Sequence, residues 1–238
     1  PHTITTKATG ARDVHAADLD GDQDIDVLSA SSSDDKIAWY ENQIGQGGDS
    51  DGFGPEQTIT TAADGAASVF AANLDGDSDM DVLSASRYDG KIAWYENQIG
   101  QGGDSDGFGP QKSITTNAGG AISVFATNLD GDSDVDVLAA SRSDDEIAWY
   151  ENQIGQGGDS DGFGSKQSIT TNASFTGDIY ATNLDGDSDA DVISTSSDKI
   201  SWYENKIGQG GDSDGFGSQQ VITTNISDGT SVHAANLD

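Results

Sequence analysis

Hydrophobic and polar residues alternate along short segments of the chain, which is the pattern of half-buried β-strands. In one representative stretch these segments are residues 68–73, 82–86, 91–97 and 111–116. Tyr88, Asp89 and Gly90 separate the second segment from the third and favour a hairpin turn. No window has the spacing of an amphipathic helix. The pattern therefore predicts units of four short antiparallel strands.

These units recur at a nearly fixed interval. Ile-Thr-Thr begins at residues 4, 59, 114, 169 and 222, so the successive spacings are 55, 55, 55 and 53 residues. Trp-Tyr-Glu-Asn begins at residues 39, 94, 149 and 202, and Ile-Gly-Gln-Gly-Gly-Asp-Ser-Asp-Gly-Phe-Gly begins at residues 44, 99, 154 and 207. Repeats of about 40–50 residues with four strands each predict an all-β fold, a β-propeller or a segment of one.

We expect residues 1–238 to form one repeat domain with four complete blades. The predicted blades are residues 13–61, 68–116, 123–171 and 178–224. Residues 1–12 are expected to hold the last strand of a preceding blade, around 3–6, and residues 231–238 the first strand of a further blade. We expect the chain to be a window of a longer array; the alternative is that the two odd strands complete a blade with another chain.

Acidic residues are concentrated in a nine-residue loop that leads from the first strand of each unit to the second. The loop covers residues 18–26, 73–81, 128–136 and 183–191, and a fifth copy begins at Asn236. Crowded carboxylates repel one another, and a hard cation such as Ca²⁺, which takes six to eight oxygen ligands, relieves that repulsion. Side chains at positions 1, 3, 5 and 9 and the main-chain carbonyl at position 7 are the expected ligands. Glycine at position 4 allows the sharp turn.

The alternatives to a calcium loop of this kind are weaker. An EF-hand needs glycine at position 6, glutamate at position 12 and flanking helices, whereas here glycine is at position 4 and Ser29 is at position 12. A solvated acidic turn does not account for four copies in register. We therefore predict about four structural calcium ions, one per complete blade. The predicted metal-binding residues are Asp18, Asp20, Asp22, Asp24, Asp26, Asn73, Asp75, Asp77, Asp79, Asp81, Asn128, Asp130, Asp132, Asp134, Asp136, Asn183, Asp185, Asp187, Asp189 and Asp191.

The glycine-rich insertion after Trp-Tyr-Glu-Asn carries a second set of aspartates. One interpretation is a second cation site; the other, which we favour, is a solvated loop in which Phe53 docks into the core. Two carboxylates alone do not fill a calcium coordination shell, so carbonyls or a neighbouring blade would have to contribute. The aspartates are Asp49, Asp51, Asp104, Asp106, Asp159, Asp161, Asp212 and Asp214.

Several other repeated residues have a structural and a functional interpretation. Trp39, Trp94, Trp149 and Trp202 are expected to pack between adjacent blades rather than to form a sugar-stacking platform. His15 and His233 take the position of Phe70, Phe125 and Tyr180, so they are expected to be packed or surface rings rather than metal ligands. Asn172 and Asn225 begin Asn-X-Ser sequons at equivalent positions and are candidate N-glycosylation sites in a secreted eukaryotic protein.

Composition limits the classes of binding partner and the expected cellular location. The chain has 42 acidic and 10 basic residues and a net charge of −32, which disfavours nucleic acid and anionic membranes as partners. It contains no cysteine, so disulfides do not stabilise it. No apolar run approaches a membrane span, and we expect no signal peptide within residues 1–238. Weak calcium sites fill only where calcium is plentiful, so we expect an extracellular or cell-surface protein.

The Asp-x-Asp-Gly-Asp-x-x-x-Asp loop, the Asp-Val-Leu that overlaps its end, the Trp-Tyr-Glu-Asn strand and the Phe-Gly before the last strand resemble FG-GAP/VCBS repeats. The resemblance covers essentially the whole chain. It implies a calcium-binding β-propeller like those of integrin α-subunit heads, some fungal lectins and many secreted microbial proteins, with the metal loop between the first and second strands of a blade. The glycine-rich insertion is longer than in a compact blade of that family.

We expect a non-catalytic extracellular scaffold for adhesion or for surface or matrix assembly, with a protein or glycan surface or further copies of itself as partner. A calcium-dependent lectin and an accessory domain of a secreted enzyme are the alternatives. Catalysis by carboxylates needs two groups in distinct environments. Glu41, Glu96, Glu151 and Glu204 recur singly, so enzymatic activity is not expected.

Overall fold

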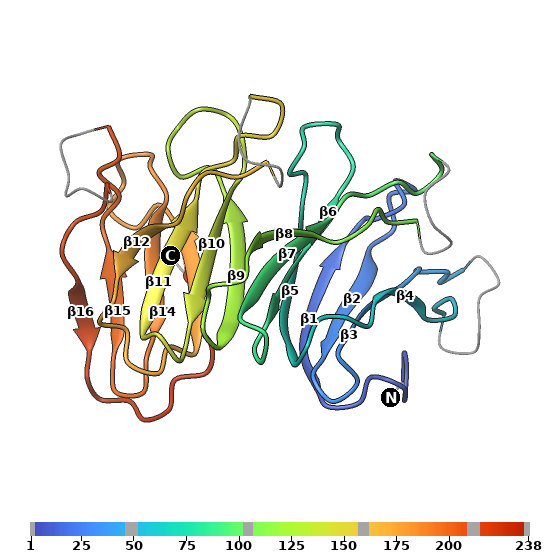
Figure 1. Ribbon diagram of the computed structural model, residues 1–238, viewed down its shortest axis with the longest axis horizontal. Helices are drawn as coiled ribbons and strands as arrows, with labels where there is room; N and C mark the ends of the chain where they lie inside the picture. Colours follow the sequence, from blue (N-terminus) through green and yellow to red (C-terminus); the bar gives the residue numbers. More distant parts are fainter. Residues whose placement is uncertain (1–2, 46–51, 102–106, 157–161, 209–214, 236–238) are drawn as a thin grey trace. The chain divides into compact units, whose positions relative to one another are not determined.

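The computed structural model describes residues 3–45, 52–101, 107–156, 162–208 and 215–235. In this part of the chain sixteen strands form four antiparallel sheets of four strands each, with no helix (Figure 1). The all-β prediction and the predicted four-stranded unit are therefore confirmed.

Each sheet is a meander in which every strand pairs with the next strand along the chain. The first sheet contains β1 (Ala11–Ala17), β2 (Asp26–Ser31), β3 (Lys36–Tyr40) and β4 (Gln57–Thr60). The second contains β5 (Ala66–Ala72), β6 (Asp81–Ser86), β7 (Lys91–Tyr95) and β8 (Lys112–Thr115). The third contains β9 (Ala121–Thr127), β10 (Asp136–Ser141), β11 (Glu146–Tyr150) and β12 (Gln167–Thr170). The fourth contains β13 (Asp178–Thr182), β14 (Asp191–Thr195), β15 (Ile200–Tyr203) and β16 (Gln220–Thr223).

The chain divides into two compact units, Pro1–Asn117 and Ala118–Asp238, with two sheets in each. The predicted blade boundaries and the single repeat domain stay predictions. Residues 3–6 and 231–235, expected as odd strands at the two ends, carry no strand. A strand needs a hydrogen-bonded neighbour, and no described strand pairs with either segment.

The core of each unit lies between its two sheets. In the first unit, Leu28 and Trp39 of the first sheet pack with Val69, Val82 and Tyr95 of the second. The second unit repeats this arrangement with Leu138, Trp149, Ile179, Val192 and Tyr203. Trp39 and Trp149 are buried in these clusters, so the predicted packing between sheets is confirmed for these two. Trp94 is buried as well, while Trp202 is half-buried.

A phenylalanine anchors the end of each glycine-rich insertion. Isolated β-bridges join Asn42 to Phe53, Asn97 to Phe108, Asn152 to Phe163 and Asn205 to Phe216. The last three of these phenylalanines are 1% exposed, whereas Phe53 is half-buried. The predicted docking into the core is therefore observed for Phe108, Phe163 and Phe216, whereas Phe53, the ring for which it was predicted, is only partly covered. Each bridge places the end of the insertion beside the asparagine of Trp-Tyr-Glu-Asn.

Candidate metal centre

The first acidic loop is curled by hydrogen bonds from its own main chain. The Asp18 carboxylate accepts bonds from the amides of Gly21 (2.8 Å) and Gln23 (3.0 Å). Asp20 accepts one from the amide of Asp22 (3.2 Å), and Asp22 accepts one from Asp24 (2.8 Å). Gly21 has a φ of 77°, a left-handed conformation that glycine adopts without strain. These hydrogen bonds fix the curl of the loop.

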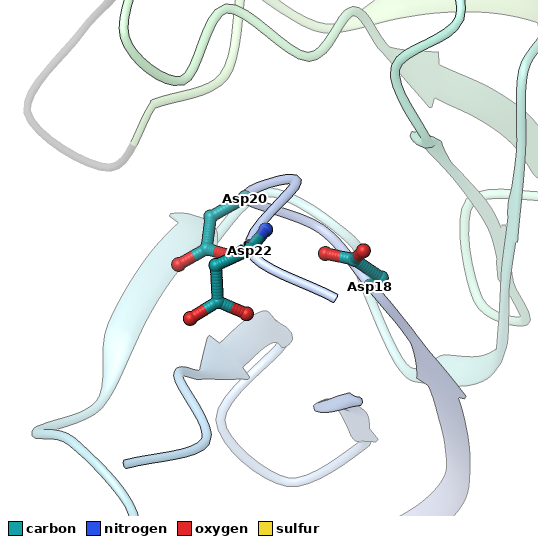
Figure 2. A group of neighbouring side chains, drawn as sticks. All are labelled: Asp18, Asp20 and Asp22. Carbon is teal, nitrogen blue, oxygen red and sulfur yellow. Dashed lines mark hydrogen bonds between the residues drawn. The ribbon is translucent and has the colours of Figure 1, made fainter. Parts of the chain in front are cut away.

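This curl brings three carboxylates together. One oxygen each from Asp18, Asp20 and Asp22 lies within 4.8 Å of the other two. Figure 2 shows the Asp18 carboxylate facing those of Asp20 and Asp22 across the loop. Calcium–oxygen distances of 2.3–2.6 Å put two ligands of one ion at most roughly 5 Å apart. The spacing and the all-oxygen donor set therefore fit a calcium ion.

The other three loops have asparagine at position 1 and keep the same curl. Asn73, Asn128 and Asn183 each accept a hydrogen bond from the glycine amide three residues later, at 2.7, 2.7 and 2.6 Å. The amide oxygen thus takes the place of the Asp18 carboxylate with one negative charge fewer.

The side chain at position 7 is engaged outside the loop. Asp79 accepts a hydrogen bond from the Gln101 side chain (2.9 Å), and Asp134 accepts one from Gln156 (2.6 Å). This arrangement is compatible with the predicted ligation through the main-chain carbonyl at position 7, which stays a prediction.

The aspartate at position 9 joins the loop to its sheet. Asp81 is 1% exposed; one carboxylate oxygen accepts from the amide of Leu74 (2.8 Å) and the other from Asn97 (2.9 Å). The other three loops make the same pair of bonds through Asp26, Asp136 and Asp191. The sequence predicted a metal ligand here. The structure adds a structural role, and ligation stays a prediction.

Burial makes these carboxylates hard to ionise in the metal-free protein. It raises the pKa of Asp81 to about 7 and that of Asp136 to about 6, against the opposing effect of the amide hydrogen bonds. Burial likewise raises the pKa of Asp20 to about 6, and the charges of Asp26, Asp22 and Glu41 add to the rise. A cation in the loop would offset both effects.

The asparagine of Trp-Tyr-Glu-Asn connects the acidic loops of adjacent sheets, a role that the sequence did not predict. The Asn97 side-chain amide donates to the carbonyls of Leu19 (2.8 Å) and Met80 (2.9 Å), and its oxygen accepts from the amide of Ile99 (3.0 Å). Leu19 belongs to the loop of the first sheet and Met80 to that of the second. In the other unit, Asn205 donates to the carbonyls of Leu129 (2.7 Å) and Ala190 (3.1 Å). The sequence carried one indication of this role, which is that the asparagine is present in all four copies of the motif.

The remaining candidate residues are placed as follows. The ring of His15, which is half-buried, lies 4.4 Å from that of Phe70 between centroids, and the ring of His233, which is exposed, lies 4.5 Å from that of Tyr180. One histidine is thus a packed ring and the other a surface ring, the two placements that the sequence predicted. Asn172 and Asn225 are exposed, and their glycosylation stays a prediction. The candidate second-site aspartates lie outside the described residues: Asp49, Asp51, Asp104, Asp106, Asp159, Asp161, Asp212 and Asp214. Across the described ranges, no helix is long and apolar enough to cross a membrane.

The glutamate of the Trp-Tyr-Glu-Asn motif is ion-paired in two of the described repeats. Glu96 lies 2.7 Å from the Lys112 ammonium and accepts a hydrogen bond from Gln98 (3.2 Å). These two bonds lower the pKa of Glu96. Glu204 pairs with Lys206 at 2.9 Å.

Two solved structures resemble this fold at low sequence identity. The virginiamycin B lyase from Staphylococcus aureus is 11% identical with a TM-score of 0.52; the match covers 92% of this chain and 57% of the lyase. A functionally unknown protein from Desulfotomaculum acetoxidans is 12% identical with a TM-score of 0.51, over 90% of this chain and 55% of that protein. The chain thus spans a little over half of each, and likeness at this identity shows the fold alone.

Comparison at the level of sequence is more specific. Curated proteins give no match. The family model described as an FG-GAP-like repeat matches residues 18–84 and 73–139, which together span more than half of the chain. Each match begins at the first residue of an acidic loop and ends in the second strand of the next sheet. The chain therefore belongs to the FG-GAP-like repeat family.

Proposed function

We propose that this chain is a calcium-stabilised, non-catalytic repeat scaffold that acts outside the cell in adhesion or in surface or matrix assembly. The observation that carries the proposal is the common construction of the four acidic loops. Each holds a curl of oxygen donors at its start and a buried aspartate at its end that accepts hydrogen bonds from two segments of the same sheet.

Calcium would stabilise such loops by binding the folded state alone. At a free calcium concentration one hundred times the dissociation constant, each independent site adds about 2.7 kcal/mol. The chain contains no disulfide that would do the same.

Two features support a non-catalytic role. The recurring glutamate, the candidate acid catalyst, would need a raised pKa, whereas the ion pair and hydrogen bond of Glu96 lower its pKa. The tryptophans Trp39, Trp94 and Trp149 are buried, so they offer no open aromatic platform to a substrate.

Near-identical repeats suit a surface that makes the same weak contact several times and gains avidity from the number of contacts. The partner would be a protein or glycan surface or another copy of the chain.

A binding assay with a metal-site variant tests this function. The protein would be applied to immobilised cell-surface and matrix preparations in calcium and in excess EDTA, with self-association followed by sedimentation. The variant carries Asp→Asn at position 5 of every loop, and the control carries Asp35→Asn, which lies outside the loops. Calcium-dependent binding that the loop variant loses and the control keeps would support the proposal. Equal binding in EDTA, or turnover of any hydrolase or lyase substrate, would contradict it.

A further inference from the structure

Phe175 occupies a backbone position at which three other repeats have glycine. Gly10, Gly65 and Gly120 each lie six residues after the isoleucine of Ile-Thr-Thr, with φ between 67° and 68°. Phe175 lies at the same offset from Ile169 and has a φ of 52°. A left-handed backbone is unfavourable for a bulky side chain. The fourth repeat therefore bears a conformational cost that the first three avoid.

The fourth sheet also has a shorter hairpin at this point. In the first three repeats, a Cβ at the glycine would collide with the hairpin between the second and third strands, at Ser33, Tyr88 and Ser143. Trp149 follows Asp136 by 13 residues, and the first two repeats have the same spacing, but Trp202 follows Asp191 by only 11. The hairpin of the fourth sheet is two residues shorter, so the residue that would collide with a Cβ in the other repeats is absent. The shorter hairpin is therefore what makes room for the phenylalanine side chain.

Hydrogen bonds hold the Phe175 backbone in this conformation. Its amide donates to the Asp145 carboxylate (2.8 Å), and the amide of Ala173 donates to the Asp145 carbonyl (2.8 Å). Thr176, which is fully buried, donates its hydroxyl proton to the Thr195 carbonyl (3.0 Å). The ring itself is 59% exposed, so its burial does not offset the backbone cost. An exposed ring held at an unfavourable position indicates a contact residue.

An arginine guanidinium lies over this ring. The Arg142 guanidinium carbon is 5.8 Å from the centroid of Phe175. All ion pairs in the described part of the chain are made by lysines, so the Arg142 guanidinium has no carboxylate partner there. Of the two neighbouring acids, Asp145 accepts from Phe175 and Asp144 accepts from the amide of Gly119 (2.7 Å). Guanidinium donors without a carboxylate partner among the described residues therefore lie over an aromatic side chain that is itself largely exposed.

We propose that Phe175 and Arg142 form a binding site for a carboxylated sugar of the uronic acid class. The apolar C–H face of the pyranose would stack on the ring, and its carboxylate would take two parallel N–H bonds from the guanidinium. Asn172 and Ser174, on the same loop, offer polar groups to the hydroxyls. The net charge of −32 opposes densely charged polyanions such as phosphates, and a single carboxylate faces less repulsion.

This site is separate from the metal loops of its unit. Arg142 lies in the hairpin after β10, whereas the acidic loop at 128–136 lies before β10, and the two connections are at opposite ends of that strand. The inference therefore does not rest on the calcium-scaffold proposal, and either can fail without the other.

Titration with the methyl glycosides of galacturonic and glucuronic acid, which carry one carboxylate each, tests the site in saturating calcium, with neutral methyl galactoside for comparison. The protein is expected to bind the carboxylated sugars in preference to the neutral ones. Phe175→Gly, which restores the glycine of the other repeats, and Arg142→Gln should each weaken binding by about tenfold or more. Arg142→Gln should also remove the preference for a carboxylate. Arg87→Gln, at the matching hairpin position of the second sheet, should leave affinity unchanged.

The same experiment can overturn the proposal. It is wrong if the unaltered protein binds none of the carboxylated sugars, or if a polyglutamate peptide binds in their place. It is also wrong if Phe175→Gly, shown to be folded by circular dichroism, binds as well as the unaltered protein.

Discussion

The side chain of Asn97 gives the sharpest test of how adjacent sheets are joined. It is 2% exposed and makes three hydrogen bonds, one of which crosses to the Leu19 carbonyl in the loop of the first sheet. Asn42, the matching residue of the first sheet, is half-buried and donates to the Ile25 carbonyl (3.0 Å) of its own loop. Asn97→Ala and Asn42→Ala thus form a matched pair that differs chiefly in the bond between sheets.

The expected difference in stability follows from the polar groups that each substitution leaves without a hydrogen-bond partner. Asn97→Ala leaves the buried Leu19 carbonyl without its partner, which costs about 1–3 kcal/mol beyond the loss shared with Asn42→Ala. A change of 1 kcal/mol moves the melting temperature of a domain of 150–250 residues by about 2–4 °C. We therefore expect the melting temperature of Asn97→Ala to lie roughly 2–12 °C below that of Asn42→Ala.

Thermal unfolding by circular dichroism in saturating calcium measures this difference, and calcium titration of the same variants tests the link to the metal loops. Asn97→Ala should weaken calcium binding in two loops because its side chain bonds to both, whereas Asn42→Ala should affect only one. If the two variants melted at the same temperature and titrated alike, the proposed connection between sheets would be refuted.

Two further predictions concern charge. The folded metal-free protein keeps protons on Asp81 up to about pH 7 and on Asp136 up to about pH 6, while the unfolded chain releases them near pH 3.8, the ordinary pKa of an aspartate. The free energy of unfolding without metal should therefore fall as the pH rises from about 4 to about 7, which denaturation at a series of pH values would measure. Calcium affinity should rise over the same interval, which calorimetry would measure. A flat profile in either measurement would contradict the pKa shifts. Lys36 pairs with Glu56 at 3.1 Å, and the third sheet has the pair with its charges exchanged. Lys36→Glu should therefore cost about 3 kcal/mol in urea denaturation, and adding Glu56→Lys should recover more than half of the loss; no recovery would refute the pairing.

The four-stranded unit and the acidic loops were predictable because each is local. Alternation identified the strands, and the copies in register separated the loop at 18–26 from an ordinary acidic turn. The docking of Phe108 was equally accessible, since a large apolar residue at the end of a polar insertion has few other places to go.

Features that depend on a neighbouring sheet were not predictable in the same way. The sequence shows Asn97 in a repeated motif, but its bond to Leu19 joins residues 78 positions apart and requires both sheets to be placed. The spacing of 53 in place of 55 is visible in the chain, yet it gains meaning only with the φ of Phe175 and the collision that glycine avoids in the other repeats. The structural role of Asp81 was hidden for another reason, since its spacing suited a metal ligand.

The central claim is that calcium in the acidic loops stabilises this fold, and bound-metal stoichiometry measured together with thermal unfolding tests it most directly. Desalted protein should carry about four calcium ions per chain, one for each complete loop. Two filled sites in each unit contribute about 5 kcal/mol at calcium well above the dissociation constant, so excess EDTA should lower the melting temperature by roughly 10 °C or more. No bound calcium at millimolar concentration, together with an unchanged melting temperature in EDTA, would contradict the account.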